Sequence, residues 1–266
     1  MWDLLGEAMT GLGRPSGVRV AHPVIWKLRS LGLEGEAESQ ALLELIKTQV
    51  GISRGEEIIG AGTFPAHLTV LLDGIACSYD RGEDGGRQIH AFHCPGDFCD
   101  LHRDMLPNDA VAVAALTDCL VGTIRYADLD QTLAQHPKLG LALWRAAMLE
   151  GSIARERLLK VSRQPALQRV AHVLCELLTR REAIGINNAV IPLSQIDLGD
   201  AAGLSVVHIT GIVQGLRTLG VLSPDSREIE VTDRERLMQL ANFDARYLSM
   251  PEGLLHWRTD VDGLFD

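Results

Sequence analysis

Long apolar runs are missing from this 266-residue sequence. No segment approaches the roughly 20 consecutive apolar residues that are needed to cross a bilayer. The N-terminus also lacks the basic and then apolar order of a signal peptide. We therefore expect a cytoplasmic protein that makes no contact with a membrane.

Cysteines are few, and their number is odd. The five cysteines are Cys77, Cys94, Cys99, Cys119 and Cys175. An odd count without a secretory context argues against a disulfide framework.

An excess of basic residues is also missing. Lys and Arg number 25 against 35 Asp and Glu, which gives a formal net charge of −10. Acidic residues also outnumber basic ones from residue 162 onward. A protein that binds nucleic acid needs a basic face, so any such contact here must depend on the local distribution of charge. No Ser/His/Asp order, phosphate-cradling glycine loop or paired acidic site is evident, so we expect no enzyme.

Residues 192–231 contain the most informative pattern in the chain. Ser194 and Ser205 stand where they can cap two short helices, and Gly203 stands where a left-handed residue would end the first helix. Apolar residues at helical spacing give the second helix a buried stripe. These residues are Ile209, Ile212, Val213 and Leu216.

A turn-rich tetrad follows at residues 224–227, between the apolar segments 221–222 and 229–231. This arrangement is typical of a β-hairpin. Helix, turn, helix and hairpin together predict a winged helix-turn-helix, which places one helix in the major groove of DNA.

Residues 51–125 alternate short apolar segments with turns rich in Gly, Asp and Pro, which predicts a β-sandwich or β-roll. Before them, residues 23–50 predict two short helices. After them, a short helix breaks near His136-Pro137, and a long helix follows.

Apolar residues recur near heptad spacing along this long helix, which makes it a candidate dimer seam. The alternative is a helix that lies on its own β-domain. The predicted seam residues are Leu139, Ala142, Leu143, Ala146, Leu149 and Ile153.

The predicted fold class is therefore α+β, with five segments along the chain. Residues 1–22 form an N-terminal extension and residues 23–136 a β-roll domain, for which the family resemblance given below implies the role of sensor. Residues 137–163 form the dimerisation helix, residues 164–248 the winged helix-turn-helix domain, and residues 249–266 a C-terminal tail.

Several motifs resemble the cAMP receptor protein / fumarate-nitrate regulator (Crp/Fnr) family of bacterial transcription factors, over roughly residues 23–248. They include Leu72-Asp73-Gly74, Pro95-Gly96-Asp97-Phe98, Asp100-Leu101-His102-Arg103, Ala142-Leu143-Trp144, the segment 169–177 and Leu193-Ser194-Gln195-Ile196-Asp197-Leu198. The Cys-Glu-Leu and Asp-Leu-His segments are most similar to FixK-like members. The resemblance implies a cyclic-nucleotide-binding-type β-roll, a homodimer, binding to a palindromic operator and contact with RNA polymerase.

The chain departs from the pattern of the members that bind cyclic nucleotides. Where those members carry Gly-Glu-Leu, this sequence has Cys99-Asp100-Leu101, and their Arg-Ser pair falls on Asp109-Ala110. Asp109 would repel a phosphate, so the pattern argues against cAMP. Phe98, Asp100, Leu101, Asp109 and Ala110 remain the candidate effector pocket. No cysteine precedes Cys77, which argues against the N-terminal iron–sulfur cluster of other members.

Histidine and cysteine gather at His90, His93, Cys94, Cys99 and His102. Such a set can ligate zinc or haem. However, neighbouring strand residues such as His93 and Cys94 point to opposite faces, which favours a structural role. A redox-sensitive cysteine is a further alternative.

The second helix of the motif lacks an expected arginine. FixK-like members read Val-His-Val-Asn-Arg where this chain has residues 207–211, so Gly211 replaces a residue that typically reaches guanine or phosphate. Val206 and Val207 can contact thymine methyl groups or pack against the first helix instead. The candidate DNA-binding residues are Gln195, Ser205, Val206, Val207, His208, Thr210, Gly211, Gln214, Arg217 and Arg227.

Three functional hypotheses follow. The first is a homodimeric transcription regulator that binds operator DNA. The second is a member with impaired DNA binding that acts through mixed dimers with another regulator. The third, compatible with the first, is a sensor gated by metal or redox state.

Overall fold

The computed structural model describes residues 22–63, 66–101, 111–226 and 228–249. Two short helices come first, α2 (Pro23–Ser30) and α3 (Glu36–Leu45), as the sequence predicted. Pro23 suits the first turn of α2 because that turn leaves its backbone N–H groups without helical partners. Leu28 and Leu42 are fully buried, so both helices pack on the body of the molecule.

Within the residues that the structure describes, seven strands form the predicted β-roll. They are β1 (Thr48–Ile52), β2 (Glu57–Ile59), β3 (His67–Asp73), β4 (Ala76–Arg81), β5 (Arg87–His93), β6 (Ala112–Ala115) and β7 (Cys119–Arg125). One sheet has the order β1-β7-β3 and the other β2-β6-β4-β5, with every pairing antiparallel. The sequence pattern missed β1, whose residues are mostly exposed and do not alternate in burial.

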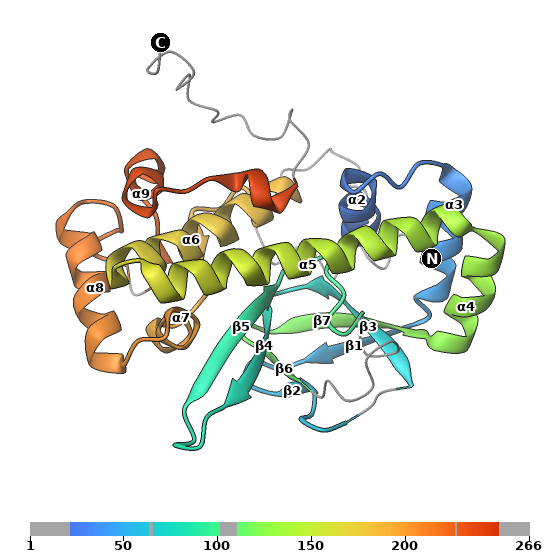
Figure 1. Ribbon diagram of the computed structural model, residues 1–266, viewed down its shortest axis with the longest axis horizontal. Helices are drawn as coiled ribbons and strands as arrows, with labels where there is room; N and C mark the ends of the chain where they lie inside the picture. The colour runs from blue at the N-terminus through green and yellow to red at the C-terminus, as the bar shows by residue number, and fades with distance from the viewer. Residues whose placement is uncertain (1–21, 64–65, 102–110, 227, 250–266) are drawn as a thin grey trace, which may run out of the picture.

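Helix α5 (Pro137–Arg163) crosses the whole molecule (Figure 1). It follows α4 (Tyr126–Gln135), and the break at His136-Pro137 falls where the sequence predicted it. At 1.5 Å per residue, its 27 residues span roughly 40 Å. Figure 1 shows α5 running from α3 and α4 at one end, over the β-roll, to α7 and α8 at the other.

The residues predicted to form the dimer seam on α5 face inward. Leu139, Ala142 and Ala146 are fully buried in a core shared with α2, α3 and β3. Leu143 is also buried there, Leu149 packs beside the same core, and Ile153 packs with Leu248. The structure therefore corrects this prediction: these side chains hold α5 to its own chain, as the alternative interpretation held.

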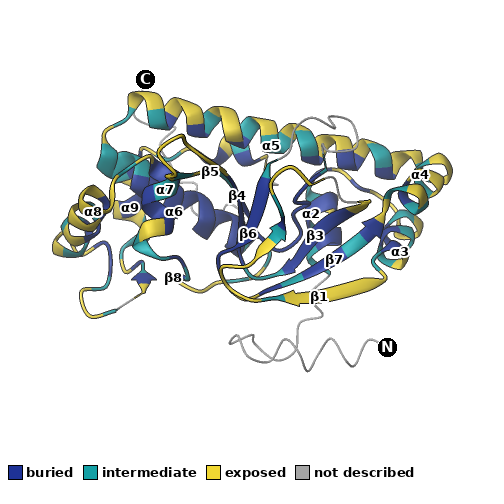
Figure 2. Cartoon of the chain, turned by 90° about the horizontal axis from the view of Figure 1, so that it is seen from below, coloured by how far each residue is buried: buried dark blue, intermediate teal, exposed yellow. Residues whose placement is uncertain are grey.

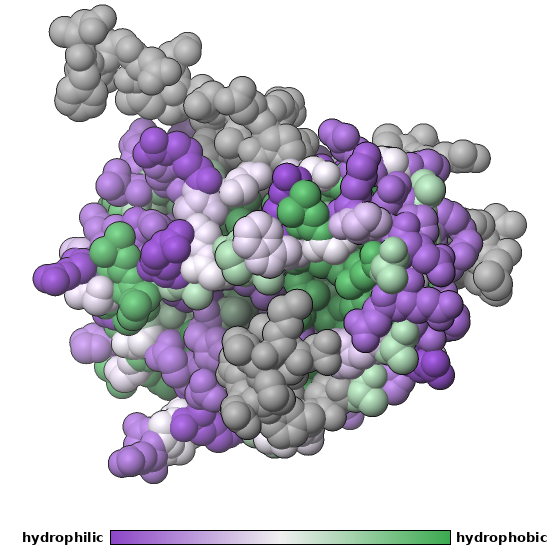
Figure 3. All heavy atoms as spheres, turned by 45° about the vertical axis from the view of Figure 1, so that its right-hand side comes forward, coloured by the Kyte–Doolittle hydropathy of each residue, from purple (hydrophilic) through white to green (hydrophobic). Residues whose placement is uncertain are grey.

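A second apolar stripe on α5 faces solvent instead. Its exposed fractions are 45% for Leu141, 59% for Trp144, 54% for Met148, 70% for Leu158 and 52% for Leu159. The outer side of α5 is exposed along its length in Figure 2, and Figure 3 shows hydrophobic side chains among hydrophilic ones on the face that α5 crosses.

The C-terminal part forms the predicted helix-turn-helix with flanking elements. They are α6 (Ala166–Ala183), β8 (Val190–Ile191), α7 (Gln195–Ala202), α8 (Val206–Thr218), β9 (Ile229–Glu230), α9 (Arg234–Ala241) and the 3-10 helix η1 (Ala245–Leu248). The wing differs from the predicted hairpin. Its last strand, β9, pairs with β8, and the segment after α8 joins it through a single bridge between Leu222 and Val231.

One apolar core crosses the predicted boundary between the sensor and DNA-binding domains. It combines Cys77, Ile89 and Phe92 of the β-roll with Leu174 and Leu198 of the C-terminal helices. The two predicted domains are thus packed together in this structure. In the described ranges, no single helix is long and apolar enough to cross a membrane; α7 and α8 reach that length only as a pair bent by 109°.

Candidate nucleic-acid interface and interdomain cavity

Helix α7 begins with a complete capping box. The Asp197 backbone N–H donates to Ser194 Oγ at 3.1 Å, and the Ser194 backbone N–H donates to Asp197 Oδ2 at 3.0 Å. Each residue satisfies a backbone donor that the helix start leaves free. The sequence predicted the Ser194 cap, and this prediction is confirmed.

The turn between α7 and α8 depends on two glycines. Gly203 ends α7 in the left-handed region, at φ 63°, as predicted. Gly199 lets the turn close, because a Cβ there would lie 3.1 Å from the Leu204 carbonyl oxygen. The resulting angle of 109° between the two helices is usual for a helix-turn-helix.

Helix α8 buries one face and exposes the other. Ile209, Val213 and Leu216 are buried, as their spacing predicted. Val206 and Val207 are 60% and 83% exposed. The alternative that these valines pack against α7 is therefore wrong, and both are free to contact a partner.

The exposed face of α8 carries no permanent charge. Ser205 caps the helix by accepting from the His208 backbone N–H at 3.4 Å. Thr210 donates its hydroxyl hydrogen to the Val206 carbonyl at 2.8 Å, which leaves only its oxygen lone pairs for another group. A Cβ on Gly211 would meet no described heavy atom within 4 Å, so the position of the expected arginine is open. Gln214 is exposed on the same helix.

The sequence offered two cations near α8, Arg217 and Arg227, as candidate DNA contacts. Arg217 Nη2 donates to the Ser226 carbonyl at 2.9 Å, so Arg217 holds α8 to the wing turn and is not a free surface charge. Arg227 lies outside the described residues. Gln195, the first residue of α7, is half-buried.

Strand β5 of the β-roll is clamped to α7 by polar contacts. Arg87 donates to Asp200 at 2.7 Å and to Asp197 at 2.5 Å. Gln88 donates to the Asp200 carbonyl at 2.7 Å. Asp197, which completes the capping box of α7, therefore also anchors the helix-turn-helix to the β-roll.

The predicted effector residues are mostly structural. Phe98 is fully buried and pairs through its backbone with Val70 in β3. Asp100 is also buried, and its Oδ1 accepts from the Thr69 backbone N–H at 2.7 Å. Leu101 packs beside the same core as Phe98, and Asp109 and Ala110 lie outside the described residues. None of these three residues lines either of the two cavities described below, which does not fit the predicted effector pocket in this part of the chain.

A cavity of about 690 Å³ lies next to them, between β5, α5 and the C-terminal helices. Its volume is in the range of small-molecule sites. Its wall includes Ile89 and Phe92 of β5, Glu150 of α5, Arg180 of α6 and Ala201 of α7. No pattern within a single strand or helix of the sequence predicts this cavity, because β5, α5, α6 and α7 contribute to its wall together.

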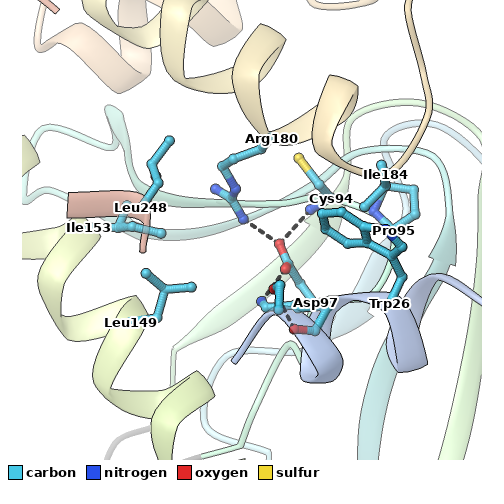
Figure 4. Close-up of a pocket in the computed structure, with 11 residues that line it drawn as sticks. Trp26, Cys94, Pro95, Asp97, Leu149, Ile153, Arg180, Ile184 and Leu248 are labelled. Carbon is cyan, nitrogen blue, oxygen red and sulfur yellow. Dashed lines mark hydrogen bonds and ion pairs between the residues drawn. The ribbon is translucent and has the colours of Figure 1, made fainter. Parts of the chain in front are cut away.

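Asp97, in the turn after β5, binds two cations at the junction (Figure 4). Lys27 of α2 and Arg180 of α6 both form ion pairs with it, and its Oδ2 accepts from the Cys94 backbone N–H at 2.7 Å. Burial would raise the pKa of Asp97, but the charges of Lys27 and Arg180 outweigh burial and hold that pKa well below its usual range. The adjoining hollow measures only about 40 Å³, room for little more than water.

A second buried pair joins α5 to α6. Arg157 donates to Glu176 Oε1 at 2.9 Å, and Arg180 reaches the same oxygen at 3.3 Å. Tyr247 donates its hydroxyl hydrogen to Glu176 Oε2 at 3.0 Å. Burial alone would raise the pKa of Glu176, but Arg157 and Arg180 lower it. The junction is thus held by interlinked charges from α2, the turn after β5, α5 and α6, together with the Tyr247 hydroxyl of η1.

The histidines and cysteines of the candidate metal or haem set do not converge in the described part of the chain. His93 Nε2 lies 2.7 Å from Ser78 Oγ, and burial lowers the pKa of His93 to about 3. Within the described ranges, no three His, Cys, Asp or Glu side chains are placed to hold one metal ion, and His102 lies outside them.

All five cysteines are buried. Burial raises the pKa of the Cys94 thiol to about 11, and the pKa values of the other four thiols are raised as well. A thiol of this kind stays protonated and reacts slowly, so the structure gives no support to a redox-sensing cysteine.

Two family models match the chain. The cyclic nucleotide-binding domain matches residues 49–136, and the Crp-like helix-turn-helix domain matches residues 168–240.

Curated relatives match over most of their length. The transcriptional activator protein FnrL of Cereibacter sphaeroides is 28% identical, over 91% of this chain and 97% of the relative. The fumarate and nitrate reduction regulatory protein of Vibrio cholerae is 30% identical, over 77% and 83%. Among solved structures, FixK2 from Bradyrhizobium japonicum is 28% identical with a TM-score of 0.63, over 74% of this chain and 98% of that one.

Proposed function

The chain belongs to the Crp/Fnr family of transcription regulators, in its FixK-like branch, and on this premise we propose that it is a homodimer that binds a palindromic operator through α8. The observation that carries the proposal is the capped, correctly bent pair α7–α8, whose second helix leaves Val206 and Val207 free. Members of this family are not enzymes, and we propose no reaction for this one. Its place of action is the cytoplasm, where bacterial DNA and RNA polymerase are found, and RNA polymerase is its proposed partner at promoters.

Without the expected arginine, α8 would recognise base pairs through apolar contacts and uncharged hydrogen bonds. Valine side chains contact the methyl groups of thymine, and Gln214 can hydrogen-bond to a base edge. His208 and the N-terminus of α8 can approach a phosphate. We therefore expect an operator whose half-sites are rich in A·T pairs.

Selection from a pool of random 30-base-pair duplexes tests this function. The full chain should enrich palindromes whose half-sites lie about 10 base pairs apart, one helical turn. Fluorescence anisotropy on the enriched duplex should give tight binding that weakens as salt rises. If no duplex binds at micromolar dimer in low salt, the proposal fails.

A charge placed on α8 supplies the matched control. Val207→Asp should weaken operator binding by at least tenfold because it brings a carboxylate against the DNA backbone. Gln239→Asp adds the same charge on the exposed surface of α9 and should leave affinity unchanged. Equal losses in both variants would show that α8 is not the reading helix.

The second apolar stripe of α5 supports the proposed homodimer. Leu141, Trp144, Met148 and Leu158 lie three, four and ten residues apart, which places them along one side of the helix. Trp144→Glu should convert the dimer to a monomer in sedimentation velocity. The matched variant Lys138→Glu, at an exposed position of the same helix, should stay dimeric.

The uncharged face of α8 favours a second candidate, a regulator with impaired DNA binding that sequesters another regulator in mixed dimers. Gly211 stands in open space where the arginine of FixK-like members is expected. Under this candidate, the chain co-purifies with a related regulator and retains no DNA.

For the sensor, we propose that cAMP is not the effector. The support is the sequence: Asp109 falls where the members that bind cyclic nucleotides carry an arginine, and its carboxylate would repel a phosphate. Neither an iron–sulfur cluster nor haem or another metal is part of this proposal.

A further inference from the structure

The large cavity touches both the sensor and the DNA-binding region. Ile89 and Ala91 come from β5, Ala154 from α5, Arg180 from α6 and Ala201 from α7. Leu158 lines the cavity and also belongs to the second apolar stripe of α5, so this end of the cavity lies beside the face proposed for the homodimer. A molecule in this space would contact the first helix of the helix-turn-helix directly.

Most of the cavity wall is apolar. An organic molecule with an aromatic or aliphatic body therefore fits it better than a sugar or nucleotide does. The apolar members of the wall are Ile89, Ala91, Phe92, Val111, Ala147, Ile153, Ala154, Leu158, Val161 and Ala201.

The two arginines on the wall already have carboxylate partners. Arg180 is bound to Asp97 and Glu176. Arg157 is bound to Glu176 and lies over the Phe92 ring, 5.0 Å from its centroid. An anionic ligand would have to compete with these internal carboxylates for either arginine.

Glu150 differs from the other acidic residues of the wall. Its Oε1 is buried and has no hydrogen-bond partner in the described part of the chain. A buried carboxylate oxygen without a partner carries a large desolvation cost. Burial raises the pKa of Glu150 to about 7, so an empty cavity favours the protonated acid.

Other charged groups face the same region from several elements. Glu150 interacts most strongly with Lys27 and Arg180, which lower its pKa, and with Asp97 and Asp100, which raise it. The remaining titratable residues on the wall are His90, His93, Cys99 and Arg157.

We propose that this cavity binds an organic cation with an apolar body, whose ammonium or amidinium group donates hydrogen bonds to the Glu150 carboxylate. This inference rests on the proposed function, because it names the effector class of the sensor. The cation neutralises the carboxylate that lacks a partner, and its apolar body fills the space between β5, α5 and α7. Because the ligand bridges the two regions, it changes the affinity for operator DNA by linkage.

Three probes of nearly equal shape test the charge requirement: 2-phenylethylamine, 2-phenylethanol and 3-phenylpropionate. Calorimetric titration of the full chain should give binding of the amine at least tenfold tighter than binding of the alcohol, and no measurable binding of the carboxylate. At pH 6, binding of the amine should release close to one proton as Glu150 ionises. Titration in two buffers of different ionisation enthalpy measures that release.

Two variants separate the site from a general effect of charge. Glu150→Gln should reduce the preference for amine over alcohol to less than twofold and abolish proton release. Glu156→Gln, on the same helix but paired with Lys160, should behave like the natural protein. Circular dichroism spectra of both variants should match that of the natural protein.

Three outcomes overturn the inference: equal binding of amine and alcohol, stronger binding of the carboxylate, or a Glu150→Gln variant that keeps the preference. Cyclic AMP, run as an anionic comparator, should not bind. Operator binding measured by anisotropy without any amine tests the proposed function separately, so failure of the two proposals can be distinguished.

Discussion

Charge is distributed in opposite ways at the two ends of the DNA-binding region. The exposed face of α8, which points away from the protein, carries no permanent charge between Val206 and Gln214. The junction between α6 and the β-roll buries Asp97, Glu176, Arg157 and Arg180 together. The chain thus places its strong electrostatic interactions where the two regions meet and leaves few for DNA. This contrast predicts that substitutions at the junction strongly lower the free energy of unfolding. Substitutions on the exposed face of α8 should change that free energy little.

The largest expected effect comes from breaking the junction. Asp97→Ala leaves Lys27 and Arg180 buried without their carboxylate and should lower the free energy of unfolding by about 3–5 kcal/mol. Urea denaturation measures this loss. Asp128→Ala removes a more exposed partner of Arg125 and should cost less than about 1 kcal/mol. If both variants lost a similar free energy of unfolding, the predicted difference between the buried junction and the surface would be wrong.

Acid should lower the stability that buried histidines contribute. Burial lowers the pKa of His93 to about 3 and of His172 to about 4, so between those values and about 6.5 only the unfolded chain binds protons at these residues. Stability from these histidines is therefore lost as pH falls below about 6.5. Glu150, with its pKa raised to about 7, binds a proton in the folded state first and opposes the loss.

The three groups together predict a net loss of about 2 kcal/mol from pH 7 to pH 5. Glu150→Gln removes the opposing contribution, so the variant should lose about 4 kcal/mol over the same interval. Urea denaturation at a series of pH values gives both slopes. A variant whose stability falls no faster than that of the natural protein would show that Glu150 does not take up this proton.

Adding a positive charge to the exposed face of α8 tests whether the missing charge limits DNA binding. Gly211→Arg has open space for its side chain and should tighten binding by about 1–3 kcal/mol to operators with a guanine in reach. Gln239→Arg adds the same charge on α9 and should have a smaller effect. Anisotropy on the selected duplex and on a variant with guanine substitutions checks this. An affinity unchanged in Gly211→Arg would place the reading contacts elsewhere.

The smallest effects concern two glycines of the helix-turn-helix. Gly211→Ala should stabilise the protein by up to about 1 kcal/mol because alanine favours the helix and the site is open. Gly203→Ala should destabilise it by about 1 kcal/mol because φ is 63° there. Thermal unfolding should shift in opposite directions in the two variants; a shift in the same direction would contradict the assigned conformations.

Local features of this protein could be predicted well from its sequence. The Ser194 and Ser205 caps, the left-handed Gly203 and the break before Pro137 all follow from neighbouring residues. Such features depend on backbone groups within a few positions of each other, so a short segment contains the information. Strand β1 was missed because its exposure does not alternate.

The side of α5 that packs on its own chain could not be predicted from the sequence. Helix α5 has apolar residues on two sides, and spacing alone cannot tell which side its own β-roll covers. The heptad-like set from Leu139 to Ile153 is turned inward, whereas Trp144 and Met148 are turned outward. Only the packing of α2, α3 and β3 against α5 decides between the two sides.

By itself, the sequence determined the order of elements, the helix-turn-helix with its caps, and the missing charge at Gly211, because these depend on residues close together in the chain. Tertiary structure alone decided that Arg180 meets Asp97, 83 positions away, that Arg87 reaches α7, and that Glu150 faces a cavity. The reason is physical: burial and pairing of a charge depend on which distant segments surround it, and no local pattern specifies those neighbours.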